Sequence, residues 1–141
     1  MRKRCVYLTT LLATILVACA SVDPQVVRLS MVTTEGDIEL ELYPGKAPLT
    51  VQNFLQLVDG GHLDGASFYR VVSPQNDNGS PVISVIQGGI GDAASPFPPI
   101  GHETTEQTGL RHLDGSISMA RGAVGTATTE FFRERPEFAP S

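Results

Sequence analysis

Hydrophobic and polar residues alternate from position 38 to position 43, where Ile38, Leu40 and Leu42 are separated by glutamates. A period of two residues is typical of a β-strand with one buried face. Residues 26–33 form a second candidate strand, and Glu35-Gly36-Asp37 supplies a tight turn between the two segments. The pattern therefore predicts a β-hairpin with one face in the core.

The period changes to that of a helix after Pro48. Apolar residues then recur at i, i+3, i+4 and i+7 and form one stripe, which consists of Val51, Phe54, Leu55 and Val58. Proline suits the first turn, because its missing N–H would have no partner there. The pair Gly60-Gly61 is expected to end the helix, since glycine accepts a left-handed cap conformation.

The period returns to two in the second half of the chain. Four further strands are predicted there, over residues 67–72, 82–87, 116–121 and 129–132. Residues 73–81 form a polar loop, and residues 93–115 form a long, Pro-containing loop of a length that is usually functional. The strand pattern breaks just after Phe132. Several strands, turn-rich connections and one early helix favour a mostly antiparallel sheet or barrel.

Composition separates the first residues from the rest of the chain. The 141 residues are 41% hydrophobic and 18% charged, which fits one globular domain. Arg2, Lys3 and Arg4 precede an almost wholly apolar run at residues 6–17. A helix needs roughly 20 apolar residues to span a bilayer, so we interpret residues 1–18 as a cleaved export signal.

The end of this segment, Leu16-Val17-Ala18-Cys19, resembles the lipobox of bacterial lipoproteins. The resemblance implies that Cys19 carries acyl chains, and that residues 19–25 tether a domain that begins at residue 26. The same resemblance implies the outer rather than the inner membrane, because Ala20 and not Asp follows the cysteine. The alternative is an ordinary cleaved signal in which Cys19 occurs by chance.

Charge and cysteine content exclude several classes of function. The formal net charge is −5 and becomes more negative once the cationic signal is removed, so the basic surface of a nucleic-acid-binding protein is missing. The two cysteines, Cys5 and Cys19, both belong to the export segment. We therefore expect no disulfide, thiol nucleophile or cysteine-based zinc site in the domain.

Other catalytic patterns are weak. The histidines at 62, 102 and 112 have no ligand spacing, and the sequence after His102 lacks the second histidine of a zinc-protease helix. The glycine-rich residues 88–91 do not lead into a helix, so they lack the context of a phosphate-binding loop. A nucleophile-elbow motif is also missing. We expect no metal site.

Four short motifs occur in a distinctive order: Phe68-Tyr69-Arg70-Val71-Val72, Val85-Ile86-Gln87-Gly88-Gly89, Gly115-Ser116-Ile117-Ser118-Met119-Ala120-Arg121 and Glu130-Phe131-Phe132. Over residues 26–132 the chain resembles bacterial cyclophilin-type peptidyl-prolyl cis-trans isomerases. The resemblance implies a mainly β fold, a closed antiparallel β-barrel with a capping helix. It also implies isomerisation of X–Pro bonds without any cofactor.

The resemblance assigns roles to individual residues. Arg70 matches the catalytic arginine, and Gln87 matches the glutamine that orients the peptide and supports the arginine. The expected substrate-binding residues are Val85, Met119, Ala120, Arg121, Glu130 and Phe132. Among them Phe132 lines the proline pocket, while Ala120 and Arg121 form the edge that binds the substrate backbone.

The chain also departs from the family pattern. Tyr69 replaces the commoner histidine, Arg121 an asparagine and Glu130 a glutamine. Ser84 stands in place of a pocket phenylalanine, so we expect a shallower proline pocket. After Phe132 the family continues with further strands and a second helix, which are missing here. We therefore expect residues 26–141 to be an incomplete domain, truncated at its C-terminus.

Together these features predict an exported, lipid-anchored prolyl isomerase that faces the periplasm and assists protein folding in the bacterial envelope. Its partners are Pro-containing segments of unfolded or exported proteins. Two alternatives remain: a catalytically weak or inactive cyclophilin-like lipoprotein that binds Pro-containing peptides, and a structural lipoprotein with no peptide pocket.

Overall fold

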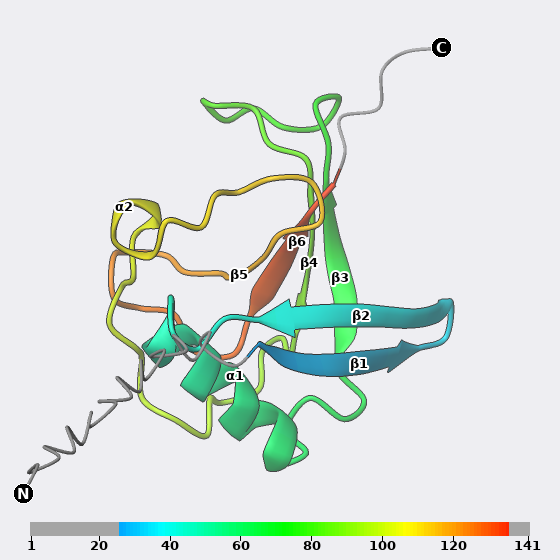
Figure 1. The fold of residues 1–141 in the computed structure, drawn as a ribbon. Coiled ribbons are helices and arrows are strands. Elements are labelled where there is room, and N and C mark those ends of the chain that lie inside the picture. The colour runs from blue at the N-terminus through cyan, green and yellow to red at the C-terminus, as the bar shows by residue number, and fades with distance from the viewer. Residues whose placement is uncertain (1–25, 136–141) are drawn as a thin grey trace, which may run out of the picture.

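The computed structural model describes residues 26–135 and is mainly β (Figure 1). The predicted export signal, the lipid anchor at Cys19 and the tether lie outside the described residues. Within the described part, the strand pairing forms a two-stranded hairpin and a four-stranded antiparallel sheet. This pairing does not by itself form the closed barrel that was predicted. Neither helix of this part is long and apolar enough to cross a bilayer.

The N-terminal hairpin is confirmed. Strand β1 (Val27–Thr33) pairs along its whole length with β2 (Gly36–Leu42). Gly36, at the turn, has a φ of 121°, a conformation that side-chain-bearing residues rarely adopt. The alternating residues Leu40 and Leu42 are buried as the pattern predicted.

The second sheet has the strand order β3-β4-β6-β5. Its strands are β3 (Ser67–Val72), β4 (Val85–Gly89), β5 (Ile117–Met119) and β6 (Phe131–Glu134). Strand β4 starts later than predicted because the backbone N–H of Ile83 bonds to the Asp77 carboxylate at 2.7 Å and so belongs to the loop. The predicted break after Phe132 is wrong, since Arg133 and Glu134 continue the ladder with β4.

Helix α1 (Pro48–Asp59) has the predicted bounds, but its buried face is shifted. Leu57 is fully buried, whereas Val58 of the predicted stripe is exposed. Asn53 is also buried, and its side-chain Nδ2 donates to a backbone carbonyl at residue 128 over 2.7 Å. The buried face therefore follows the contacts of α1 with both the core and the chain that leads into β6.

The start of α1 is capped from the long loop. No side chain at Ala47 caps the helix. Instead the Glu103 carboxylate accepts the backbone N–H groups of Leu49 at 3.0 Å and Thr50 at 2.8 Å. A carboxylate satisfies free N–H groups there and also interacts favourably with the helix dipole. The long loop is thereby attached to the helix.

A short helix, α2 (Thr105–Thr108), interrupts the loop that was predicted to be irregular. Thr104 and Gln107 form a reciprocal capping box, in which each side chain accepts the other residue's backbone N–H. The sequence signal for this, a Thr followed three residues later by Gln, was present. Figure 1 shows α2 on the opposite side of the molecule from the tip of the β1–β2 hairpin.

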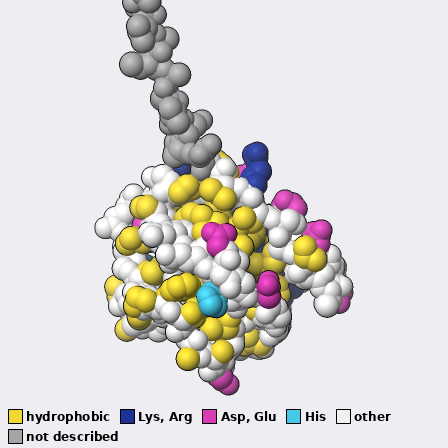
Figure 2. Space-filling view, turned by 90° about the horizontal axis from the view of Figure 1, so that it is seen from below, with side chains coloured by type: hydrophobic (Ala, Val, Ile, Leu, Met, Phe, Trp, Pro, Cys, Tyr) yellow, Lys and Arg dark blue, Asp and Glu magenta, His cyan; other side chains and the backbone are white. Residues whose placement is uncertain are grey.

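The core lies between the hairpin, α1 and one face of the four-stranded sheet. Its buried cluster comprises Leu40, Leu42, Val51, Phe54 and Phe131. On the outer side, α1 exposes Leu49 and Val58. Figure 2 views the molecule from below, where hydrophobic side chains are spread among isolated acidic groups, and Lys and Arg lie only towards the edges.

Candidate active site

A β-bulge in β3 brings Arg70 to the predicted glutamine. Phe68 pairs with Gly88 and Arg70 pairs with Gln87, so Tyr69 is an extra residue in β3. The guanidinium Nη1 of Arg70 donates to the Gln87 Oε1 over 2.9 Å. Arg70 is exposed, so a ligand can reach its guanidinium.

The same face of the sheet carries one transverse row of residues. Arg70 on β3 lies opposite Gln87 on β4, Gln87 lies opposite Phe132 on β6, and Phe132 lies opposite Ser118 on β5. Directly opposed residues in antiparallel strands project to the same face. A cationic donor, an amide and an aromatic ring therefore stand side by side across three adjacent strands.

The neighbouring row projects into the core. Phe68, Gly88, Phe131 and Met119 are opposed in that order. Phe131 contacts both Phe68 and Phe54 edge to face, with ring centroids 5.8 Å apart in each pair. A Cβ on Gly88 would lie 2.9 Å from the Phe68 ring, so this glycine lets the two rings meet.

Tyr69 and Glu130 extend the polar side of the site. Gln87 Nε2 donates to the Tyr69 hydroxyl over 2.9 Å, and that hydroxyl donates to a Glu130 carboxylate oxygen in a short hydrogen bond. Partial desolvation and the bond to Glu130 raise the pKa of Tyr69 above its ordinary value of 10.0. The phenol is therefore neutral throughout the physiological pH range.

Phe132 forms the apolar side, and His112 from the long loop covers it. The two rings stack with centroids 5.9 Å apart and an interplanar angle of 20°. His112 Nδ1 lies 3.4 Å from a Glu134 carboxylate oxygen and 3.3 Å from the Ser118 hydroxyl. His112 thus has polar contacts to β5 and β6 on the face that carries Arg70.

Comparisons with known proteins show the family of the chain. Residues 28–134 match the family model described as cyclophilin type peptidyl-prolyl cis-trans isomerase/CLD. The chain belongs to this family. It is 37% identical over 106 residues to peptidyl-prolyl cis-trans isomerase A of Dickeya dadantii, covering 72% of this chain and 50% of that protein. It is 38% identical over 101 residues to peptidyl-prolyl cis-trans isomerase cyp18 of Streptomyces antibioticus, covering 71% and 57%.

This cyclophilin-family chain spans about half the length of the curated relatives that it matches. The matched region contains Arg70, Gln87 and Phe132. Family membership therefore rests on the region that carries the site.

The other predicted site residues are placed differently. Val85 is buried, and Met119 packs against the core cluster, so neither lies open beside Arg70. The backbone N–H of Ala120 already donates to the carbonyl of Glu130 over 2.7 Å. Arg121 is exposed, and its Nη1 lies 3.3 Å from the carbonyl of its neighbour at 122. The substrate-binding roles of these residues stay predictions.

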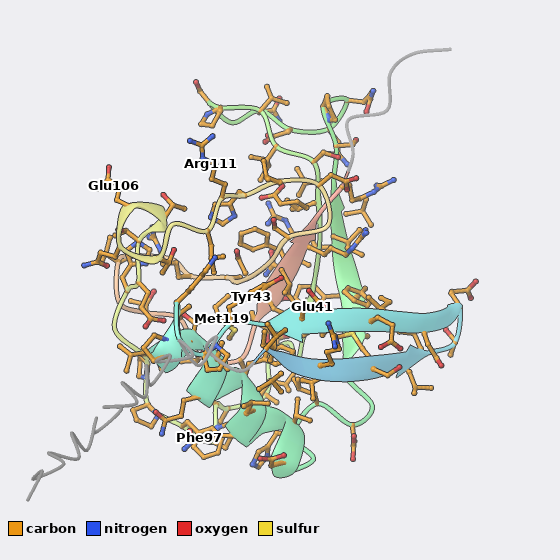
Figure 3. The ribbon with its side chains drawn as sticks, in the orientation of Figure 1. Glu41, Tyr43, Phe97, Glu106, Arg111 and Met119 are labelled. Atoms are coloured by element: carbon orange, nitrogen blue, oxygen red, sulfur yellow. The ribbon has the colours of Figure 1, made fainter. Side chains whose placement is uncertain are left out.

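A hollow of about 820 Å³ lies beside the apolar side of the site. It is lined by β2, the start of α1, much of the long loop, and Met119 and Phe132. Figure 3 shows Met119 in this region together with Glu41, Tyr43 and Arg111. Arg70 and Gln87 are not among the lining residues, so the hollow is separate from the polar end of the row.

Asp77 fixes the loop that follows β3. Asp77 accepts the backbone N–H groups of Ile83 at 2.7 Å and Gly79 at 2.9 Å. These two bonds, with a smaller contribution from the Arg70 charge, lower the pKa of Asp77 below 3.8.

Among residues 26–135, no group of three or more His, Cys, Asp or Glu side chains could hold a metal ion.

Two parts of the site were not predicted from the sequence. No spacing or motif singles out His112, whose role depends on how the long loop folds over Phe132. The bond between Tyr69 and Glu130 had a partial signal, because both residues depart from the family pattern. Their contact shows that the two departures occur together in space.

Proposed function

We propose that the protein is a peptidyl-prolyl cis-trans isomerase that acts on X–Pro bonds of exported proteins. The observation that carries the proposal is the row of Arg70, Gln87 and Phe132 across three adjacent strands. The aromatic ring can hold a proline ring by apolar contact, while the guanidinium lies one strand beyond the glutamine.

The chemistry needs only positioned donors. Rotation about an X–Pro bond has a barrier of roughly 18–20 kcal/mol, because it disrupts amide resonance. In the twisted transition state the proline nitrogen regains a lone pair. A hydrogen bond from Arg70 to that nitrogen stabilises the twisted state more than either planar state, which is the requirement for catalysis. The planar, permanently charged guanidinium suits this role.

Gln87 orients the arginine in this mechanism. Its Oε1 accepts one guanidinium N–H and leaves other donors of the fork for the substrate. The bond from Arg70 to the proline nitrogen is charge-assisted. Such a bond contributes about 1.5–3 kcal/mol, which corresponds to roughly 10- to 150-fold in rate.

The location and the complete fold belong to the same proposal. The signal at residues 1–18 and the lipobox ending at Cys19 support export and lipid anchoring, facing the periplasm and in the outer membrane rather than the inner. Anchored there, the enzyme assists folding steps that take tens of seconds without catalysis.

The closed barrel expected for the family would include both sheets as parts of one fold.

A second candidate function is peptide binding without efficient turnover. His112 stacks on Phe132 and covers part of the apolar surface that a proline ring would use. Such a protein would hold Pro-containing segments but accelerate their isomerisation little. The two functions differ in whether the rate depends on Arg70.

A peptidase-coupled isomerisation assay on an X–Pro peptide distinguishes them. The full chain should exceed the uncatalysed rate, and Arg70→Ala should lower kcat/KM by about 10- to 100-fold. Arg133→Ala is a matched control, because Arg133 is on β6 one residue from the row. Binding of the peptide in calorimetry with no rate enhancement would establish the binding module instead. No binding at all would favour a structural lipoprotein.

A further inference from the structure

The hydrogen bonds beyond Gln87 have a fixed direction. Gln87 Nε2 donates to the Tyr69 hydroxyl at 2.9 Å, and that hydroxyl donates to Glu130. A hydroxyl has one proton. Because the Tyr69 hydroxyl uses its single proton in the hydrogen bond to Glu130, it can only accept a hydrogen bond from Gln87. The amide nitrogen must then face Tyr69, and the amide oxygen must face Arg70.

Glu130 is itself held in place. One carboxylate oxygen accepts the backbone N–H of Gly91 at 3.1 Å and lies 3.3 Å from the Thr129 hydroxyl, while the other accepts from Tyr69. A Cβ on Gly89 would lie 2.5 Å from both oxygens. The second glycine of the Gln-Gly-Gly motif therefore leaves the space that this carboxylate occupies.

The bulge makes this arrangement possible. In a regular strand, Tyr69 and Arg70 would project to opposite faces. The extra residue in β3 disrupts that alternation, so both side chains reach the Gln87 amide. The bulge therefore gives one glutamine two neighbours with opposite requirements, a donor on one side and an acceptor on the other.

We propose that Tyr69 and Glu130 are positioning residues, which hold the Gln87 amide with its oxygen towards Arg70 and so orient the guanidinium. The inference rests on the proposed isomerase function and assigns Glu130 a different role from the predicted contact with substrate. Without this restraint the amide has two orientations of almost the same shape. In the flipped one, its N–H groups face a guanidinium that also has only donors.

The kinetic test uses Tyr69→Phe and Glu130→Ala in the full chain, because alanine leaves no acceptor for the Tyr69 hydroxyl. Each should lower kcat by about 3- to 10-fold with little change in KM, because a positioning residue acts through Gln87 and not through contact with the substrate. Tyr43→Phe is the matched control, since it removes a comparable 2.9 Å tyrosine–glutamate bond, to Glu41 on the hairpin. Full activity in both folded variants, or a change in KM alone, would overturn the proposal.

A double-mutant cycle separates positioning from direct contact. If Tyr69 acts through the glutamine, Tyr69→Phe should cause no further loss once Gln87→Ala is present. Losses that multiply would show that Tyr69 acts on the substrate itself, and would contradict the proposal.

A titration tests the same geometry without turnover. In the Tyr43→Phe background, the phenolate absorbance that Tyr69→Phe removes should develop above pH 10, and Glu130→Gln should lower its midpoint. An unchanged midpoint in Glu130→Gln would show that the bond is missing. If the titration behaves as expected in a chain with no isomerase activity, the proposed function fails and the hydrogen-bonded arrangement stands.

Discussion

Removal of the Glu103 carboxylate should destabilise the protein, although it lies far from α1 in sequence. Glu103→Ala leaves the N–H groups of Leu49 and Thr50 without their acceptor. Loss of a capping side chain costs typically about 1 kcal/mol, and loss of the charge at the helix N-terminus adds about 0.3–1 kcal/mol. Leu49 is 47% exposed, so water can replace part of its bond. We expect a loss of about 1–2 kcal/mol.

Thermal unfolding followed by circular dichroism measures this loss. For a domain of this size the expected decrease in Tm is about 4–10 °C. Glu103→Gln should lose less, because its amide oxygen can still accept one N–H. Glu35→Ala, at the exposed turn of the hairpin, is the control and should change Tm little. A Glu103→Ala protein as stable as this control would show that the carboxylate does not stabilise the start of α1.

Three further outcomes follow from the contacts. Gly88→Ala should cost about 1–3 kcal/mol in denaturant unfolding, because its Cβ would lie 2.9 Å from the Phe68 ring. Asn53→Ala should cost about 1–3 kcal/mol in the same assay, because it removes the hydrogen bond that the buried Asn53 side chain donates to the carbonyl of Thr128. The pKa of Asp77 is lowered on folding, so its stabilisation is present above pH 3.8 and is lost as the pH falls through the lower folded value. The protection of the Ile83 amide, which is its exchange rate relative to that of an unstructured amide at the same pH, should therefore persist down to about pH 4. Loss of protection at a higher pH would contradict this.

Local patterns were sufficient to predict the hairpin, α1 and β3. Each depends on a period of apolar residues and on a turn or cap within a few residues of it, as with Gly36 or Pro48. Boundaries were less accurate where contacts from outside the segment decide the pairing of its backbone. The bond from Ile83 to Asp77 delays β4, and ladder pairing carries β6 through Arg133 and Glu134 despite their charge.

The site was predictable only in part. Arg70, Gln87 and Phe132 were identified through family motifs, and the structure places them in one row. The bulge at Tyr69 could not be read from the sequence, because strand periodicity assigns alternate residues to opposite faces. The contact between His112 and Phe132 also depends on the course of the long loop.

In the proposed function, the Arg70 guanidinium catalyses rotation about an X–Pro bond. Exchange NMR measures this directly, on a peptide with resolved cis and trans signals mixed with the full chain. We expect cis–trans exchange peaks within a mixing time far shorter than the uncatalysed tens of seconds, and their loss with Arg70→Ala. Equal exchange with the wild-type chain and with Arg70→Ala would contradict it.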